Sequence, residues 1–229
     1  MKPLKILLLA VIAIHLISCG TTRMLTSGVT SKQIDTILYI KPLTSISVIN
    51  KGNKPEFDGQ MSNLCEGHLT NKIIEYFPHS IGLKMVDFDS ITQGDVDFHF
   101  LNILNAVEQQ QSIVNLPIPT FLDSLLKKNN VNYALYVYQS GFTRSKNNYA
   151  GQIAKGVLIG VLTLGTVYTV PVKANSLLIC CIIDGKNKNI AFYRKDLKQD
   201  LDPVNPNTTN SQVEDIFERY LYSKDTQSN

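Results

Sequence analysis

Hydrophobic residues recur along this chain with two periods, and each period predicts one kind of element. Short β-branched and aromatic runs are typical of buried strands, and they occur at residues 36–42, 45–50 and 83–89. Apolar positions at three- and four-residue steps predict helices with one buried face, at residues 60–77, 95–111, 120–128 and 211–222. Phe98 leaves a strand start open in the second of these helices, and Thr120 with Asp123 predicts a capping pair in the third.

The second half of the chain contains the longest apolar runs. Residues 133–142, YALYVYQSGF, are apolar on both faces of a strand, which predicts a central position in a sheet. Residues 176–184 and 190–196 flank the polar turn GKNKN and predict a β-hairpin. The order of all these elements predicts an α/β (α+β) fold. We expect a mixed sheet of about five strands with helices packed on it, a late hairpin and a C-terminal helix.

A glycine-rich apolar insertion at residues 149–173 fits neither period. It has no charged residue at 156–172, which is shorter than the roughly 20 apolar residues of a membrane-spanning helix. Three interpretations stay open: a segment packed on the domain or covered by a loop, an exposed contact for a partner or a membrane, and a strand of a pore. A pore strand should alternate apolar and polar residues, which this segment does not do. The candidate interaction surface consists of Gly156, Val157, Leu158, Gly160, Val161, Leu162 and Gly165.

The first residues of the chain have the layout of a secretory signal. Lys2 and Lys5 precede an apolar stretch at residues 6–17, which is too short to span a bilayer. The Leu-Ile-Ser-Cys sequence that follows resembles the lipobox of bacterial lipoproteins, in which the cysteine thiol receives a diacylglycerol and becomes the new amino terminus. The resemblance implies cleavage between Ser18 and Cys19 and a lipid on Cys19. The alternative is an apolar helix that happens to end in a cysteine.

The position of this cysteine predicts the organisation of the chain. Residues 1–18 form the signal peptide, residues 19–34 form the lipidated cysteine and a polar tether, and residues 35–229 form a single periplasmic α/β domain that contains the insertion. The Gly-Thr-Thr-Arg run after Cys19 has no acidic residue. By resemblance to lipoprotein sorting signals, this run implies an outer-membrane anchor that faces the periplasm. Acyl chains hold such a domain firmly, because each buried CH2 group contributes about 0.8 kcal/mol.

Composition fits a folded domain behind this anchor. The chain is 44% hydrophobic and 18% charged, which is typical of globular proteins. Without Lys2 and Lys5 the 22 basic residues fall to 20, against 19 acidic residues, so no nucleic-acid partner is indicated. Cys65, Cys180 and Cys181 cannot all pair with one another, and adjacent residues in a strand point to opposite faces. We therefore expect buried free thiols.

The strand and turn sequences resemble a known family. The segments ILYIKP, LKMVDFD, VNYALYVYQSGF and ICCIIDGKNKNIAFYRKD follow the plan of periplasmic lipoproteins built on the TolB amino-terminal fold, which curli-export lipoproteins and activators of penicillin-binding proteins share. The resemblance covers roughly residues 36–196, and residues 90–119 depart from the plan. It implies a lipid-anchored interaction, scaffold or activator module for an envelope assembly, with an envelope protein as partner. A subunit of an outer-membrane export pore and an envelope-modifying enzyme are the alternatives.

Motifs that would carry catalysis do not occur in the sequence. It contains no G-x-S-x-G, H-E-x-x-H or paired C-x-x-C motif. His68, His79 and His99 are scattered along the chain. Two carboxylate pairs could hold a hard cation, namely Asp87 with Asp89 and Asp95 with Asp97, but their positions are more typical of turn caps. We therefore predict no catalytic residue, no metal and no cofactor, and a non-enzymatic role.

Overall fold

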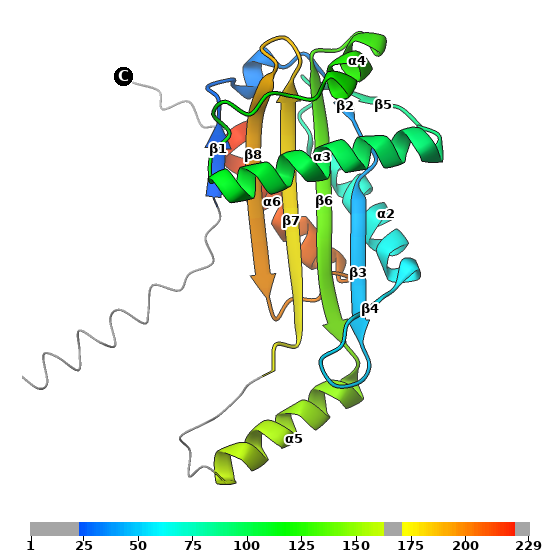
Figure 1. Ribbon diagram of the computed structural model, residues 1–229, viewed down its shortest axis with the longest axis vertical. Helices are drawn as coiled ribbons and strands as arrows, with labels where there is room; N and C mark the ends of the chain where they lie inside the picture. The colour runs from blue at the N-terminus through cyan, green and yellow to red at the C-terminus, as the bar shows by residue number, and fades with distance from the viewer. Residues whose placement is uncertain (1–22, 163–170, 223–229) are drawn as a thin grey trace, which may run out of the picture.

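A single mixed sheet organises the protein. The computed structural model describes residues 23–162 and 171–222, with the side chains of Arg23 and of residues 156–162 excepted. The sheet has eight strands in the order β1-β8-β7-β6-β2-β5, with β3 beside β6 and β4 beside β3 (Figure 1). The strands are β1 (Arg23–Thr26), β2 (Thr36–Tyr39), β3 (Leu43–Ile49), β4 (Glu56–Phe57), β5 (Gly82–Met85), β6 (Tyr133–Arg144), β7 (Ala174–Asp184) and β8 (Asn189–Gln199). The predicted fold class is confirmed, with more strands than expected.

Helices connect and cover these strands. They are the 3-10 helix η1 (Ser31–Gln33) and the α-helices α2 (Gly59–Tyr76), α3 (Ser90–Gln110), α4 (Thr120–Lys128), α5 (Lys146–Leu162) and α6 (Pro206–Leu221). The helices α2 and α6 lie on one face of the sheet, and α3 and α4 lie on the other (Figure 1). Each predicted helix is therefore present, although several boundaries differ.

The strand β6 lies at the centre of the sheet, as its apolar sequence predicts. Its first residues pair in parallel with β2, and its later residues pair in parallel with β3 on the same side. The strand β7 is antiparallel on the other side, and β8 completes the predicted hairpin. Parallel and antiparallel neighbours therefore meet at β6, which makes the sheet mixed.

Two hydrophobic cores lie on opposite faces of the sheet. The core under α2 and α6 includes Leu135, Val137 and Cys180, whereas the core under α3 and α4 includes Tyr136 and Cys181. The two adjacent cysteines are fully buried and point to opposite faces, as the strand pattern predicts. All three cysteines of the described residues are free thiols, so the expectation of buried thiols is confirmed.

The long strands β6, β7 and β8 pass through two differently covered halves. In the half next to the β7–β8 turn, which we call the hairpin half, residues 133–137 of β6 are buried between both helical layers. In the other half, which we call the open half, α6 covers one face, and α3 crosses the other face only nearer the hairpin (Figure 1). There Ser140 and Phe142 of β6 are partly exposed, and Leu197 of β8 is 42% exposed.

Two helices begin earlier than the apolar period indicates, because their caps precede the repeat. The helix α3 starts directly after Asp89, whose Oδ1 accepts two backbone N–H hydrogen bonds at 2.9 and 3.0 Å. The helix α6 starts at Pro206, since a proline at the first helical position loses no hydrogen bond, and the Asn205 side chain caps it. The predicted capping pair of α4 is wrong, because Asp123 instead binds Lys127 at 2.7 Å.

The predicted tether at residues 19–34 is wrong over most of its length. Arg23–Thr26 form β1, which runs antiparallel to β8 with Arg23 opposite Lys195. Leu25 packs against the core under α3, and Ile34 is buried. Without β1, the edge of β8 would present unpaired backbone groups. The segment that forms β1 has no strand period in its sequence, but it pairs with these groups. Only residues 20–22 then separate Cys19 from the folded domain.

Candidate functional site

The predicted interaction surface falls on α5. Residues 156–162 form its last turns, whereas Gly165, like Ser18 and Cys19, lies outside the described residues. Residues 149–162 are helical, so the interpretation as a pore strand is wrong for this part of the insertion. The helix α5 projects beyond the end of β6 and stands apart from both helical layers (Figure 1). Within residues 23–162 and 171–222, no helix is long and apolar enough to cross a membrane.

The first turns of α5 are fastened to one backbone carbonyl. Gly52, in the loop between β3 and β4, has a φ of +62°, a conformation that glycine adopts without steric cost. Its carbonyl oxygen accepts hydrogen bonds from Nη1 of Arg144 at 3.0 Å, Nδ2 of Asn148 at 3.0 Å and Nε2 of Gln152 at 3.3 Å. Asn148 is buried at this position. Three side chains on β6 and α5 therefore fix the direction in which the helix leaves the sheet.

The chain returns to the sheet beside the point where it left. The backbone N–H of Arg144 donates to the carbonyl of Lys173 at 3.2 Å, and Nε of Arg144 donates to the carbonyl of Val172 at 2.7 Å. The N–H of Lys173 donates in turn to Asp200 at 2.9 Å. The two ends of the insertion are thus hydrogen-bonded to each other between the antiparallel strands β6 and β7. The insertion does not interrupt the pairing of these strands.

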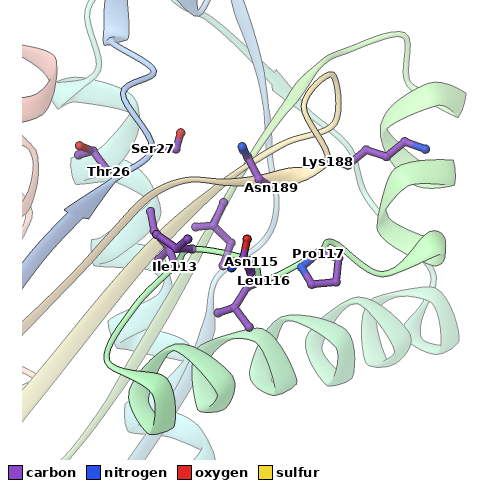
Figure 2. Close-up of a pocket in the computed structure, with 10 residues that line it drawn as sticks. Thr26, Ser27, Ile113, Asn115, Leu116, Pro117, Lys188 and Asn189 are labelled. Carbon is purple, nitrogen blue, oxygen red and sulfur yellow. The ribbon is translucent and has the colours of Figure 1, made fainter.

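A groove opens beside β1 at the hairpin end of the sheet. It has a volume of about 580 Å³ and lies between the end of β1, the connection from α3 to α4 and the β7–β8 turn (Figure 2). Its lining residues are Thr26, Ser27, Ile113, Val114, Asn115, Leu116, Pro117, Lys188, Asn189 and Ile190. Val114 is 66% exposed, which places an apolar side chain at the surface.

Sequence reasoning did not identify this groove. Residues 111–119 have no helical or strand period, and the two prolines in them indicate only a break between helices. The available signal was the apolar content of this break, with Ile113, Val114 and Leu116 in a connection that should otherwise be polar. Its meaning depends on β1 and on the β7–β8 turn, which are far away in the sequence.

Titratable side chains with shifted pKa values fasten α3 to the sheet. Burial raises the pKa of Asp97 on α3, which accepts a hydrogen bond from the hydroxyl of Tyr136 on β6 at 3.0 Å. Near the other end of α3, Glu108 accepts a hydrogen bond from the hydroxyl of Tyr193 at 2.5 Å and forms an ion pair with Lys195. Burial also raises the pKa of both tyrosines. These polar groups therefore stabilise the contact between α3 and the sheet at both ends of the helix.

The remaining polar residues lie apart from one another. A smaller concavity of about 300 Å³ at the end of β2 contains an ion pair between Lys41 and Glu66 at 3.1 Å. The ring of His99 stacks on Phe121, with ring centroids 5.0 Å apart. Asp89 caps α3, which confirms its interpretation as a turn cap. Among the described residues, no three His, Cys, Asp or Glu side chains lie close enough together to hold a metal ion.

Comparisons with known proteins place the chain near several solved structures. No protein-family model matches it, and no curated protein matches its sequence. It is similar to the PelC dodecamer from Paraburkholderia phytofirmans, at 8% identity over 90% of this chain and 100% of that chain, with a TM-score of 0.40. It is also similar to lipoprotein GNA1162 from Neisseria meningitidis, at 9% identity over 82% and 98% of the two chains, with a TM-score of 0.34.

A third similar structure is the LpoB C-terminal domain from Escherichia coli. The identity is 13% over 76% of this chain and 89% of that chain, and the TM-score is 0.30. At identities and TM-scores this low, the likenesses assign neither a family nor a function to the chain.

Proposed function

We propose that this chain is a lipid-anchored cell-envelope protein that acts by binding another envelope protein and not by catalysis. The observation that carries the proposal is the position of β1. The folded domain begins at Arg23, four positions after the cysteine of a lipobox-like sequence. A lipid on Cys19 would hold the edge of the sheet close to a bilayer. The lack of an acidic residue after Cys19 supports the outer membrane, with the domain on its periplasmic side.

Two surfaces support contact with other molecules. The groove beside β1 is lined by apolar residues, among them the exposed Val114, together with polar residues such as Asn115 and Lys188, and protein interfaces commonly combine apolar and polar groups. The helix α5 stands outside the fold on a fixed base. Asp97, whose pKa is raised by burial, accepts a hydrogen bond from the hydroxyl of Tyr136. This carboxyl group therefore stabilises the contact between α3 and the sheet.

The anchor is tested by mass spectrometry of protein purified from membranes. We expect the wild-type chain to begin at Cys19 and to carry acyl groups, and Cys19→Ala to be recovered without lipid and with its leader intact. Cys65→Ala is the matched control, because it removes a buried thiol of the folded domain and should leave the lipid in place. An unmodified thiol at Cys19 in the wild type contradicts the proposal.

The binding role is tested by photo-crosslinking in intact cells. Reactive side chains are introduced at Val114 in the groove, at Leu197 on the open half and at Ala154 on α5, all of which are exposed, with Glu75 on α2 as the control. We expect one defined protein adduct from at least one of the first three positions and none from Glu75. No adduct at any position, or ring-shaped particles of the pure protein in negative-stain images, would favour the alternatives of an enzyme or an export pore.

A further inference from the structure

We infer that α5 is a second membrane contact, and that the bilayer which holds the lipid runs along the β1 edge of the sheet and meets the end of this helix. The inference rests on the proposed lipidation of Cys19. It names a lipid surface as the ligand of α5, where the sequence alone leaves a partner protein or a membrane open.

The connection between the lipid and the sheet is short. Cys19 stands four positions before Arg23, and four fully extended residues span at most about 14 Å. Arg23, which pairs with Lys195 of β8, must therefore lie within that distance of the lipidated residue. The strand β1 forms one edge of the sheet, so this edge is held against the bilayer.

The length of this connection also excludes an orientation in which the hairpin end of the sheet rests on the bilayer. From Lys195 to Asn189, where β8 begins at the hairpin end, the strand has six residue steps, or about 20 Å. A domain that stood on its hairpin end would place Arg23 further from the bilayer than the connection can reach. The membrane must therefore lie beside the β1 edge or towards the open half.

The helix α5 points towards the same side of the molecule as β1. In Figure 1 this helix starts at the end of β6, runs obliquely past the ends of β7 and β8, and finishes on the side of the molecule where β1 lies. A single flat surface along that side can therefore touch the β1 edge and the C-terminal end of α5 together. The hydrogen bonds of Arg144 and Asn148 to the carbonyl of Gly52 set this direction at the base of the helix.

The composition of the insertion suits a membrane surface. Residues 145–173 contain three basic residues and no acidic residue, which suits the surface of an anionic bilayer. The basic residues are Lys146, Lys155 and Lys173. Shortly after Lys155, residues 157–162 are apolar or glycine at every position, over more than one full helical turn. A helix that docks in a protein groove needs only one apolar face, whereas a full helical turn whose sequence is apolar at every position suits immersion in lipid.

The experiment uses the full-length lipidated chain in vesicles of phosphatidylcholine and phosphatidylglycerol that contain nitroxide-labelled lipids. An environment-sensitive fluorophore is attached at Ala154→Cys on α5, and the matched control carries it at Lys186→Cys on the β7–β8 turn. Both positions are exposed, whereas Cys65, Cys180 and Cys181 are buried and should remain unlabelled. We expect the nitroxide lipids to quench the probe at position 154 several-fold more strongly than the probe at position 186.

A second variant tests the apolar end of the helix itself. With Val157→Asp and Val161→Asp added, the fold and the lipid stay in place, and quenching at position 154 should fall to the level of the control. Lipidated protein that floats with the vesicles while position 154 stays unquenched overturns the inference and leaves the proposed anchor intact. A probe at 154 that responds only to an added envelope protein overturns it as well. Protein that carries no lipid and does not float contradicts the proposed anchor instead.

Discussion

The hairpin half and the open half of the sheet are built from the same three strands but are stabilised differently. In the hairpin half, β6 and β7 bury apolar side chains on both faces, among them Tyr136 and Ile182. In the open half, polar side chains are fully buried between α6 and the sheet, namely Gln139 and Ser176 of the sheet and Gln212 of α6, and the other face is partly exposed. Apolar burial contributes over the whole area removed from water, whereas each buried hydrogen bond contributes only about 1 kcal/mol net.

This difference between the two halves indicates which part of the fold is more stable and which part opens more easily. Local openings concentrate where apolar contacts are few, so we expect the open half to open before the hairpin half. The helix α5 is attached to the open half, and the groove lies at the hairpin end. The protein thus combines a stable end with the groove and a less stable end that carries the proposed membrane contact.

The largest effect should come from the hairpin half. Phe100 on α3 is fully buried and stacks on Tyr136, with ring centroids 4.4 Å apart. We expect Phe100→Ala to lower the free energy of unfolding by about 3–5 kcal/mol, because it leaves a cavity between α3 and the sheet. Urea denaturation measures this loss. Phe98→Ala is the control on the same helix, because Phe98 is 63% exposed, and it should change little. Equal losses for the two variants would contradict the placement of the core.

The buried polar group of the open half should have the next largest effect. Gln212 on α6 donates to the carbonyls of Ser176 and Asp196 at 3.0 and 3.3 Å, and it accepts a hydrogen bond from the Ser176 hydroxyl at 2.7 Å. Gln212→Ala leaves these groups buried without a partner, so we expect a loss of about 2 kcal/mol. Ser211→Ala changes the exposed neighbour and is the control. In native-state hydrogen exchange, Gln212→Ala should speed the exchange of the open half more than that of the hairpin half.

These two halves also show what the sequence can predict. The run at residues 133–137 is apolar in consecutive positions, and burial on both faces follows directly from it. The opposite directions of Cys180 and Cys181 follow from the strand period alone. Local periodicity therefore predicts the hairpin half well.

Features that depend on distant residues could not be predicted. The strand β1 pairs with residues about 170 positions away, and its own sequence has no strand period. The composition of the insertion is visible in the sequence, but its base depends on the carbonyl of Gly52, almost 100 residues before Asn148. Pro206 shows a different limit, because a proline can either end a helix or start one, and only the packing of α6 decides.

A smaller effect should come from Asp97 in the hairpin half, which should make the free energy of unfolding depend on pH. Burial raises the pKa of Asp97 in the folded protein, so the folded state binds this proton more tightly than the unfolded state. The contribution of Asp97 to the free energy of unfolding therefore falls as pH rises from the usual aspartate pKa, about 3.9, through the raised value. Asp97→Asn keeps an acceptor for the Tyr136 hydroxyl and should remove this fall. We expect it to be more stable than the wild type at neutral pH.

The measurement for Asp97 is urea denaturation at a series of pH values. Asp95→Asn, at an exposed position on the same helix, is the control and should follow the wild-type curve. Parallel curves for Asp97→Asn and the wild type would show that this carboxyl group is not destabilised by burial. The contact between α3 and β6 would then be more open to water than its position in the hairpin half indicates.

The smallest effect on global stability should come from the base of α5, although its local effect is specific. Asn148→Ala removes the donor to the carbonyl of Gly52 and the acceptor for Nη1 of Arg144, whose distances are 3.0 and 2.9 Å. The contacts lie at the end of the open half, so melting of the whole domain should shift little. We expect the amides of α5 to exchange about five-fold faster, which corresponds to a local loss of about 1 kcal/mol.

The neighbouring residue gives a close control for this last effect. Asn147→Ala removes a side chain of the same chemistry from an exposed position one residue away, so it tests the loss of the contact separately from the change in helix propensity. If both variants exchange alike, the carbonyl of Gly52 does not hold the helix. If only Asn148→Ala exchanges faster, α5 is held by polar contacts at its base. A helix held in this way can lose its direction while the hairpin half stays folded. The open half, to which α5 is attached, shares strands with the hairpin half but is stabilised by different contacts.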